Sequence, residues 1–159
     1  MNMSDNLKQI LTVIALKRSS ERATKRSKSH NYANHFAEAL QHGLGIRIIE
    51  QANGNANYFC AEVSGSAIAI SPLASHDGWW EKPSDGFAQL RKRLGCRLGI
   101  VFLALSKSEV HGFWVAGPDF ETELGHHTKI HGDHVERAER RGLARRFLDL
   151  GKFIEIIAK

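Results

Sequence analysis

The sequence predicts an α/β fold with a mixed central sheet of about five to six strands flanked by helices. A helical pattern precedes three short strand patterns, a further helical pattern follows, and residues 98–105 are then continuously apolar. An unbroken apolar run of this length is typical of a central strand that is covered on both faces. Because a helix between two strands permits a parallel crossover, we expect a mixed sheet with helices on its faces.

The size and composition of the chain fit one ordinary domain. It has 159 residues, of which 42% are hydrophobic and 25% charged, and a chain of this size buries roughly 70% of its surface without a disulfide or a metal. Cys60 and Cys96 have no C-x-x-C spacing, so we expect free thiols. No run approaches the roughly 20 apolar residues of a membrane span, and the N-terminus has no signal-peptide pattern. The expected location is cytoplasmic, without a membrane partner.

The N-terminal part is expected to differ from the rest of the chain. Ser4 or Asp5 can cap a first helix whose apolar residues repeat at helical spacing up to Leu16. The Ser-rich, basic stretch that follows has no apolar period. The predicted organisation is therefore an N-terminal helix and basic arm over residues 1–28, and a single α/β domain over residues 29–159.

The elements of this domain follow from changes in the apolar period. Ser29 is the expected cap of the second helix and Gly43 its expected stop, with an apolar stripe between them. Pro72 is expected to end the third strand because proline has no N–H to donate. Residues 75–84 are polar and turn-rich, so we expect a loop there. The expected strands are residues 46–49, 57–63, 66–71, 98–105, 111–116 and 152–158, and the remaining expected helices are residues 86–94 and 133–148.

Basic residues are concentrated in three clusters, which hold fifteen of the 22 Lys and Arg residues of a chain with net charge +5. Such clustering favours a polyanion partner, although a basic cluster can also be a solvated helix face. In the last predicted helix, three arginines at i, i+4 and i+8 form one row that can follow a phosphate backbone. The expected nucleic-acid-binding residues in the second and third clusters are Arg91, Lys92, Arg93, Arg97, Arg137, Arg141 and Arg145.

Two adjacent tryptophans, Trp79 and Trp80, stand in the predicted loop beside Lys82. Exposed aromatic rings can stack on bases, and each such contact contributes roughly 1 to 3 kcal/mol in proteins that bind single strands. The alternative interpretation is a loop pinned to the core by its tryptophans, because Trp is usually largely buried.

A histidine cluster occupies residues 126–134. His127, His131 and His134 have spacings of four and three, which one helix face could present to zinc. Gly132 disfavours a regular helix there, and no further ligand completes a recognised zinc pattern. We therefore expect histidines of a loop or a helix start and assign no metal ligands, with a metal or a pH-sensitive contact as the alternatives.

From about residue 29 to residue 106, the element order and two residues resemble the restriction-endonuclease-like PD-(D/E)XK superfamily, most nearly its Mrr-like branch. Glu38 stands where that family has an inward helix Glu, and Gln89 matches the Gln of its second helix. The run at residues 98–105 is similar to the strand that follows. The resemblance implies a nuclease-like topology and assigns Glu38 and Gln89 to the catalytic site.

The catalytic signature of that family is missing. Asn57 stands where the family has its Asp, and residues 68–73 contain neither the carboxylate nor the lysine of its E-x-K motif. Two carboxylates normally hold the divalent cation there, and an amide binds it far more weakly. Either the fold is kept for binding, or the site has moved to other residues, for which Glu62, Glu81, Lys82 and Lys92 are candidates.

Three functions remain open from the sequence. The leading hypothesis is a nucleic-acid-binding protein, for DNA or RNA, on a nuclease-like fold with a degenerate metal site. The second is an active metal-dependent endonuclease or phosphodiesterase in which Glu38 or Glu62 holds Mg²⁺. The third is a protein-interaction factor, accessory or inhibitory to a mobile element, whose basic faces contact a protein partner. A homodimer is compatible with all three.

Overall fold

The computed structural model describes residues 28–51, 58–75, 77–83, 87, 89, 97–105 and 110–158. The predicted N-terminal helix and most of the basic arm lie outside the described residues. So do the turn at residues 53–55 and most of the predicted helix at residues 86–94, of which Phe87 and Gln89 are described and helical.

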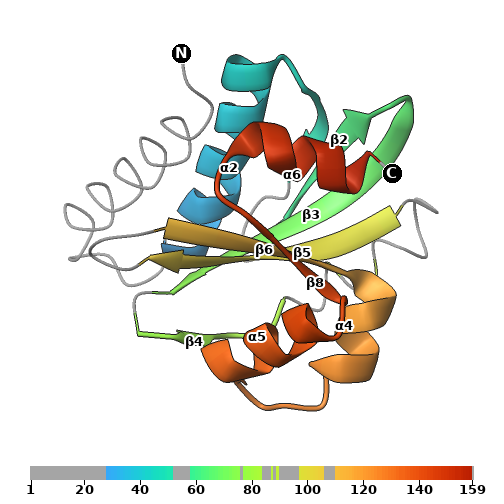
Figure 1. Cartoon of the computed structure of the whole chain (residues 1–159). Helices are drawn as coiled ribbons and strands as arrows, with labels where there is room; N and C mark the ends of the chain where they lie inside the picture. The colour runs from blue at the N-terminus through green and yellow to red at the C-terminus, as the bar shows by residue number, and fades with distance from the viewer. Residues whose placement is uncertain are drawn as a thin grey trace.

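The described part of the chain forms three layers, with a six-stranded sheet in the middle (Figure 1). In sheet order the strands are β1 (Arg47–Gln51), β2 (Phe59–Val63), β3 (Ser66–Ser75), β5 (Arg97–Leu105), β6 (Val110–Ala116) and β8 (Ala144–Phe147). The β3 and β5 strands pair in parallel, and every other neighbouring pair in this sheet is antiparallel. The predicted α/β class with a mixed central sheet is therefore confirmed.

The β5 strand lies inside the sheet and is covered on both faces, as its unbroken apolar sequence predicts. Ile100 and Phe102 face one side, Val101 and Leu103 face the other, and all four side chains are at most 1% exposed. Successive side chains of a strand point to opposite faces, so both faces of the sheet need apolar cover.

Helices α2 (Lys28–Leu44) and α6 (Leu150–Ile157) cover the first face (Figure 1). Phe36, Ala37 and Leu40 of α2 are fully buried there, as the predicted stripe requires. The helix runs past Gly43, its expected stop, and ends where Gly45 adopts a φ of +68°. At this left-handed glycine the Ile46 N–H donates to the carbonyl oxygen of Leu40 at 3.1 Å, which closes the helix end.

The second face is covered by short elements (Figure 1). They are α4 (Gly117–Glu123), α5 (Gly132–Arg140) and a separate two-stranded sheet of β4 (Trp79–Trp80) and β7 (Ile130–His131). The α4 helix was not predicted, although Pro118 at its start is a typical helix-start signal. Cys60 is buried on this side as a free thiol, as expected. None of the described helices has the length and apolar character needed to cross a membrane.

The third strand does not end at Pro72. It continues to Ser75 because β3 pairs with β5 over its whole second half, with Pro72 opposite Val101 and Ser75 opposite Ala104. On its other side, β2 is paired with β3 only as far as Ile70. Proline is tolerated at such a position, where one side of the strand needs no N–H donor.

The predicted helix over residues 133–148 is wrong in its second half. The α5 helix ends at Arg140, Gly142 turns the chain with a φ of +76°, and residues 144–147 form the edge strand β8 beside β6. Gly142 lies where a left-handed residue stops a helix most easily. The charged residues that suggested one helix over residues 133–148 therefore belong to two elements, α5 and β8.

The predicted final strand at residues 152–158 is also wrong, because this segment is α6. Asp149 caps the helix, its Oδ1 accepting the Lys152 N–H at 2.8 Å. Leu150, Phe153 and Ile157 are buried at helical spacing against the first face. The isoleucines have high strand propensity, but the cap and the apolar period outweigh that propensity.

Gly112 provides a test of the corrected C-terminal topology. It lies opposite Phe147 in the β6–β8 pair, and a Cβ added there would overlap the Phe147 ring. We expect Gly112→Ala to destabilise the fold by about 1–3 kcal/mol through overpacking, measured by denaturant unfolding. Gly132→Ala is the control, since its Cβ would approach nothing closer than 3.8 Å. Equal stability of the two variants would contradict the β6–β8 pairing.

Candidate nucleic-acid interface

A tight turn after β3 sets the direction of the two tryptophans. The Ser75 hydroxyl accepts the N–H groups of Gly78 and Trp79, each at 3.0 Å, and donates to Asp77 Oδ1 at 2.9 Å. Gly78 has a φ of +85°, which a glycine adopts at low cost. The Trp79 N–H and the Ser75 hydroxyl together hold the pKa of the Asp77 carboxyl below its usual value. The charged Asp77 thus acts as part of the turn.

Trp79 and Trp80 form the short strand β4 within the segment that was expected to be a loop, and their side chains point in opposite directions. The described residues on either side of β4, 77–78 and 81–83, are neither helix nor strand, as expected. Trp80 is 3% exposed, lies edge-on to Phe102 at 5.3 Å, and donates its indole N–H to the carbonyl oxygen of Leu103 at 3.2 Å. Base stacking by Trp80 is therefore ruled out, because its ring is part of the core. Trp79 is 49% exposed, and its ring centroid lies 4.5 Å from that of His131.

Two histidines build the start of α5 next to Trp79. His131 Nδ1 accepts the Asp133 N–H at 3.1 Å, and His134 Nδ1 accepts the His131 N–H at 3.0 Å, which is a reciprocal capping box. The adjacent Gly132 N–H donates to the Gly78 carbonyl oxygen at 2.8 Å, so the start of α5 is tied to the turn before β4. The interpretation of these histidines as residues of a helix start is confirmed.

His127 precedes β7 and stacks on His134. The two ring centroids are 3.8 Å apart and the planes differ by 5°, while the His126 ring lies 4.1 Å from that of His127. Imidazole nitrogens bind a metal in the plane of the ring, so two stacked rings cannot direct them at one ion. Across the described ranges of the chain, no three His, Cys, Asp or Glu residues are grouped as a metal site requires.

Both stacked histidines favour the neutral state. Desolvation, followed by electrostatic repulsion from His126, Arg137 and Lys82, lowers the pKa of His127 below its usual 6.5. Desolvation likewise lowers the pKa of His134, together with repulsion from His127, and Asp133 only partly opposes this effect. At neutral pH the two stacked rings are therefore uncharged, and the cations Lys82 and Arg137 lie near them.

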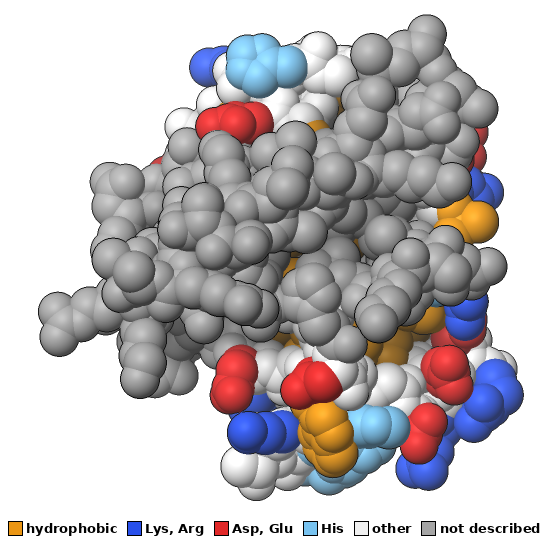
Figure 2. Space-filling view, turned by 90° about the vertical axis from the view of Figure 1, so that its left-hand side faces the viewer, with side chains coloured by type: hydrophobic (Ala, Val, Ile, Leu, Met, Phe, Trp, Pro, Cys, Tyr) orange, Lys and Arg blue, Asp and Glu red, His pale blue; other side chains and the backbone are white. Residues whose placement is uncertain are grey.

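Cationic side chains lie around the two stacked rings. Lys82 Nζ donates to the Gly125 carbonyl oxygen at 2.7 Å, which holds its ammonium group beside the histidine segment. Lys129 lies 3.8 Å from Glu81, and both side chains are largely exposed. Figure 2 shows an exposed hydrophobic side chain next to histidines at this end of the molecule, with basic and acidic side chains around them. We call the surface formed by Trp79, Lys82, His126, His127, His131, His134 and Arg137 the Trp79 surface.

The predicted row of arginines does not exist, because its members lie on different elements. Arg137 is exposed on α5 and acts on the histidines. Arg141 follows that helix and pairs with Glu123 at 2.7 Å. Arg145 is exposed on β8. The next residue, Arg146, pairs with Glu139 and lies over the Phe113 ring on the second face of the sheet. Because successive strand residues alternate, Arg145 faces the first face.

Of the second basic cluster, Arg97 is the member that the structure describes. It begins β5, is exposed, and donates from NH1 to the Ile157 carbonyl oxygen at 3.1 Å, so it lies beside the end of α6. Arg91, Lys92 and Arg93 lie outside the described residues. Arg97 is thus on the first face of the sheet, away from the Trp79 surface.

The two candidate carboxylates of the nuclease hypothesis, Glu38 and Glu62, do not converge. Glu38 is exposed on α2, above the first face. The strand neighbours of Glu62, Ala61 and Val63, are buried on the first face under α2, so the Glu62 side chain points to the second face. There it pairs with Arg47 at 3.2 Å. Gln89 is exposed beyond Phe87, which packs on the second face. The sheet separates Glu38 from Glu62, so they cannot hold one cation together.

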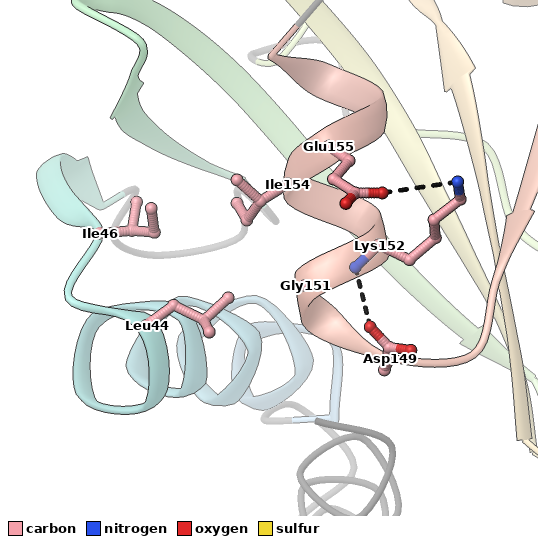
Figure 3. A pocket seen from close by; sticks show the side chains of 7 residues that line it. All are labelled: Leu44, Ile46, Asp149, Gly151, Lys152, Ile154 and Glu155. Atoms are coloured by element: carbon pink, nitrogen blue, oxygen red, sulfur yellow. Dashed lines mark hydrogen bonds and ion pairs between the residues drawn. The ribbon is translucent and has the colours of Figure 1, made fainter. Parts of the chain in front are cut away.

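A hollow of about 620 Å³ lies on the other side of the sheet, between the end of α2 and α6 (Figure 3). Figure 3 shows Ile154 pointing from α6 toward Ile46, with Leu44 below. Lys152 and Glu155 pair at 3.5 Å on α6, so part of its charged rim is neutralised internally. This hollow has neither an exposed aromatic ring nor a group of cations among the described residues.

Comparison of the chain with protein-family models, with curated proteins and with solved structures finds no match in any of the three.

The histidine stack predicts that stability depends on pH. Because the folded state lowers the pKa of His127 and His134, their contribution to stability is present above pH 6.5 and is lost as pH falls through the lowered values. We expect a lower melting temperature at pH 5.5 than at pH 7.5. The His134→Gln variant should show a smaller difference, because Gln keeps an acceptor for the His131 N–H and does not titrate. His42→Gln on α2 is the control, and a His134→Gln variant that keeps the whole difference would contradict this assignment.

Proposed function

We propose that this chain is a nucleic-acid-binding protein that contacts single-stranded DNA or RNA through the Trp79 surface. The observation that carries the proposal is the exposed indole of Trp79, supported from one side by His131 and bordered by cationic side chains. This combination of an aromatic platform and basic groups is the arrangement that single-strand binders use.

The position of Trp79 suits it to stacking. Its neighbour Trp80 is fixed in the core, and β4 pairs with β7, so the backbone of Trp79 is held rigidly. A ring that is held in place loses little conformational entropy when a base stacks on it. In a duplex the base faces are already covered by neighbouring bases, so an aromatic platform favours unpaired strands.

The electrostatics of the molecule support the same partner. The chain has a formal net charge of +5, and Arg137 and Arg140 on α5 form no ion pair with any residue that the structure describes. Such cations can neutralise phosphates and release counterions, which favours binding at low salt. Asp133 and Glu136 on the same helix reduce this attraction, so we expect moderate affinity with a strong salt dependence.

Binding is favoured over catalysis because no described group of residues resembles a catalytic site. Cleavage by a metal-dependent nuclease needs carboxylates that hold a cation beside the scissile phosphate. Glu38 and Glu62 lie on opposite faces of the sheet, and Glu62 forms an ion pair with Arg47. A charged surface of this kind could also bind a protein. In that case the experiments below would find no binding to nucleic acid alone.

The first experiment measures the contribution of Trp79. We expect the full chain to bind a fluorescein-labelled oligo(dT) in a fluorescence anisotropy titration at low salt. Trp79→Ala should weaken binding by roughly 1 to 3 kcal/mol, about 5- to 150-fold, because the stacking ring is removed. Trp79→Phe should recover part of that loss, since it keeps an aromatic face. Equal affinity of wild type and Trp79→Ala would refute the role of this ring, and no binding at low salt would refute the proposed function.

The second experiment separates specific phosphate contacts from net charge. Arg137→Gln and Arg141→Gln remove the same charge, but Arg141 is paired with Glu123, whereas Arg137 forms no ion pair with a described residue and acts electrostatically on His127 and His134. We expect Arg137→Gln to reduce the slope of log K against log salt by about 0.7, the value for one phosphate contact on a single strand. Arg141→Gln should change it less. The reverse order would contradict a contact at the Trp79 surface.

A further inference from the structure

His127 differs from the other histidines of the Trp79 surface in its hydrogen bonding. His131 and His134 each use Nδ1 as an acceptor for a backbone N–H, so protonation of that atom would break the cap of α5. For His127, neither ring nitrogen has a hydrogen bond to any described residue, and its backbone N–H alone is bonded, to the Leu124 carbonyl oxygen at 3.2 Å. His127 can therefore accept a proton without losing a hydrogen bond to the described residues.

The charged groups around His127 come from each element packed near it. Lys82 approaches from the segment after β4, Arg137 and His134 from α5, and His126 from its own segment. Two acids on the neighbouring elements have partners of their own: Asp133 lies 3.4 Å from His131 Nδ1, and Glu81 pairs with Lys129 at 3.8 Å. Two permanent cations, Lys82 and Arg137, act on the charge of His127, so an anion is the partner that this position lacks.

We propose that the Trp79 surface binds a phosphate group of the nucleic acid at His127, between Lys82 and Arg137, and that binding is coupled to the uptake of one proton by the His127 ring. The proton comes from solvent, is held on a ring nitrogen as an N–H that donates to the phosphate, and returns to solvent on release. This inference rests on the proposed function and specifies its phosphate contact and its pH dependence.

The direction of the pH dependence follows from linkage. In the free protein the pKa of His127 is lowered, mainly by desolvation and then by the neighbouring cations. A bound phosphate neutralises those cations and accepts a hydrogen bond from the charged ring, so the pKa of His127 rises in the complex. Between the free and the bound value, the complex holds one more proton than the separate partners. Affinity therefore increases as pH falls, by at most tenfold per pH unit for a single proton.

The test measures oligo(dT) affinity from pH 8 to pH 6 at constant low salt, with circular dichroism to verify that the fold is intact throughout. We expect the wild type to bind about three- to tenfold more tightly at the lower pH, as one titrating group allows. Isothermal titration calorimetry in two buffers of different ionisation enthalpy should register proton uptake of up to one per site. His127→Gln should still bind through Trp79 and Arg137, with little pH dependence and little proton uptake.

One control separates the possible failures. His42→Gln removes an exposed histidine on α2, outside the Trp79 surface, and should keep the wild-type pH dependence. If the wild type binds equally at both pH values, or if His127→Gln keeps the full dependence, the proton-coupled phosphate site is overturned while the proposed function stands. No binding of wild type at any pH overturns both.

Discussion

The fold depends on the burial of β5 on both of its faces. Its side chains alternate between two apolar layers, and neither layer can be left to water without exposing a row of fully buried residues. Two helices cover the first face, whereas the second is covered by shorter elements, including the β4–β7 pair. Trp80 is anchored there by its bond to Leu103, and because β4 is a strand, its neighbour Trp79 must face solvent. The exposed ring is thus a direct consequence of how the core is closed.

Much of the fold could be predicted from local patterns. The three strands β1 to β3, the central strand β5 and the buried stripe of α2 each show their apolar repeat within a short stretch of sequence. The errors lie where two signals compete or where pairing is distant in sequence. The isoleucines near the C-terminus suggest a strand, but the Asp149 cap and the burial of Phe153 fix a helix. The β4 strand exists because Trp80 pairs with Ile130, fifty residues away, and no local pattern can indicate that pairing.

The candidate site was predictable in composition and not in geometry. The tryptophans, the histidine cluster and Arg137 all stand out in the sequence. Their arrangement was not accessible, because it depends on β7 lying against β4 and on the reciprocal cap of α5. A spacing of four and three suggested that one helix face presents three histidines, yet only His134 is on the helix, after the cap residue His131. Gly142 was the available signal that the row of arginines is broken.

The proposed function requires that the nucleic acid contacts one tryptophan out of three. In a ¹⁵N-labelled sample the indole N–H signals of the three tryptophans are separate probes. Trp79 is exposed, Trp80 is hydrogen-bonded on the second face of the sheet, and Trp114 packs against Phe153 on the first face. Titration with oligo(dT) followed by NMR compares them directly. We expect the Trp79 indole signal to shift with ligand concentration while those of Trp80 and Trp114 stay in place. An unchanged Trp79 signal during saturable binding would contradict it.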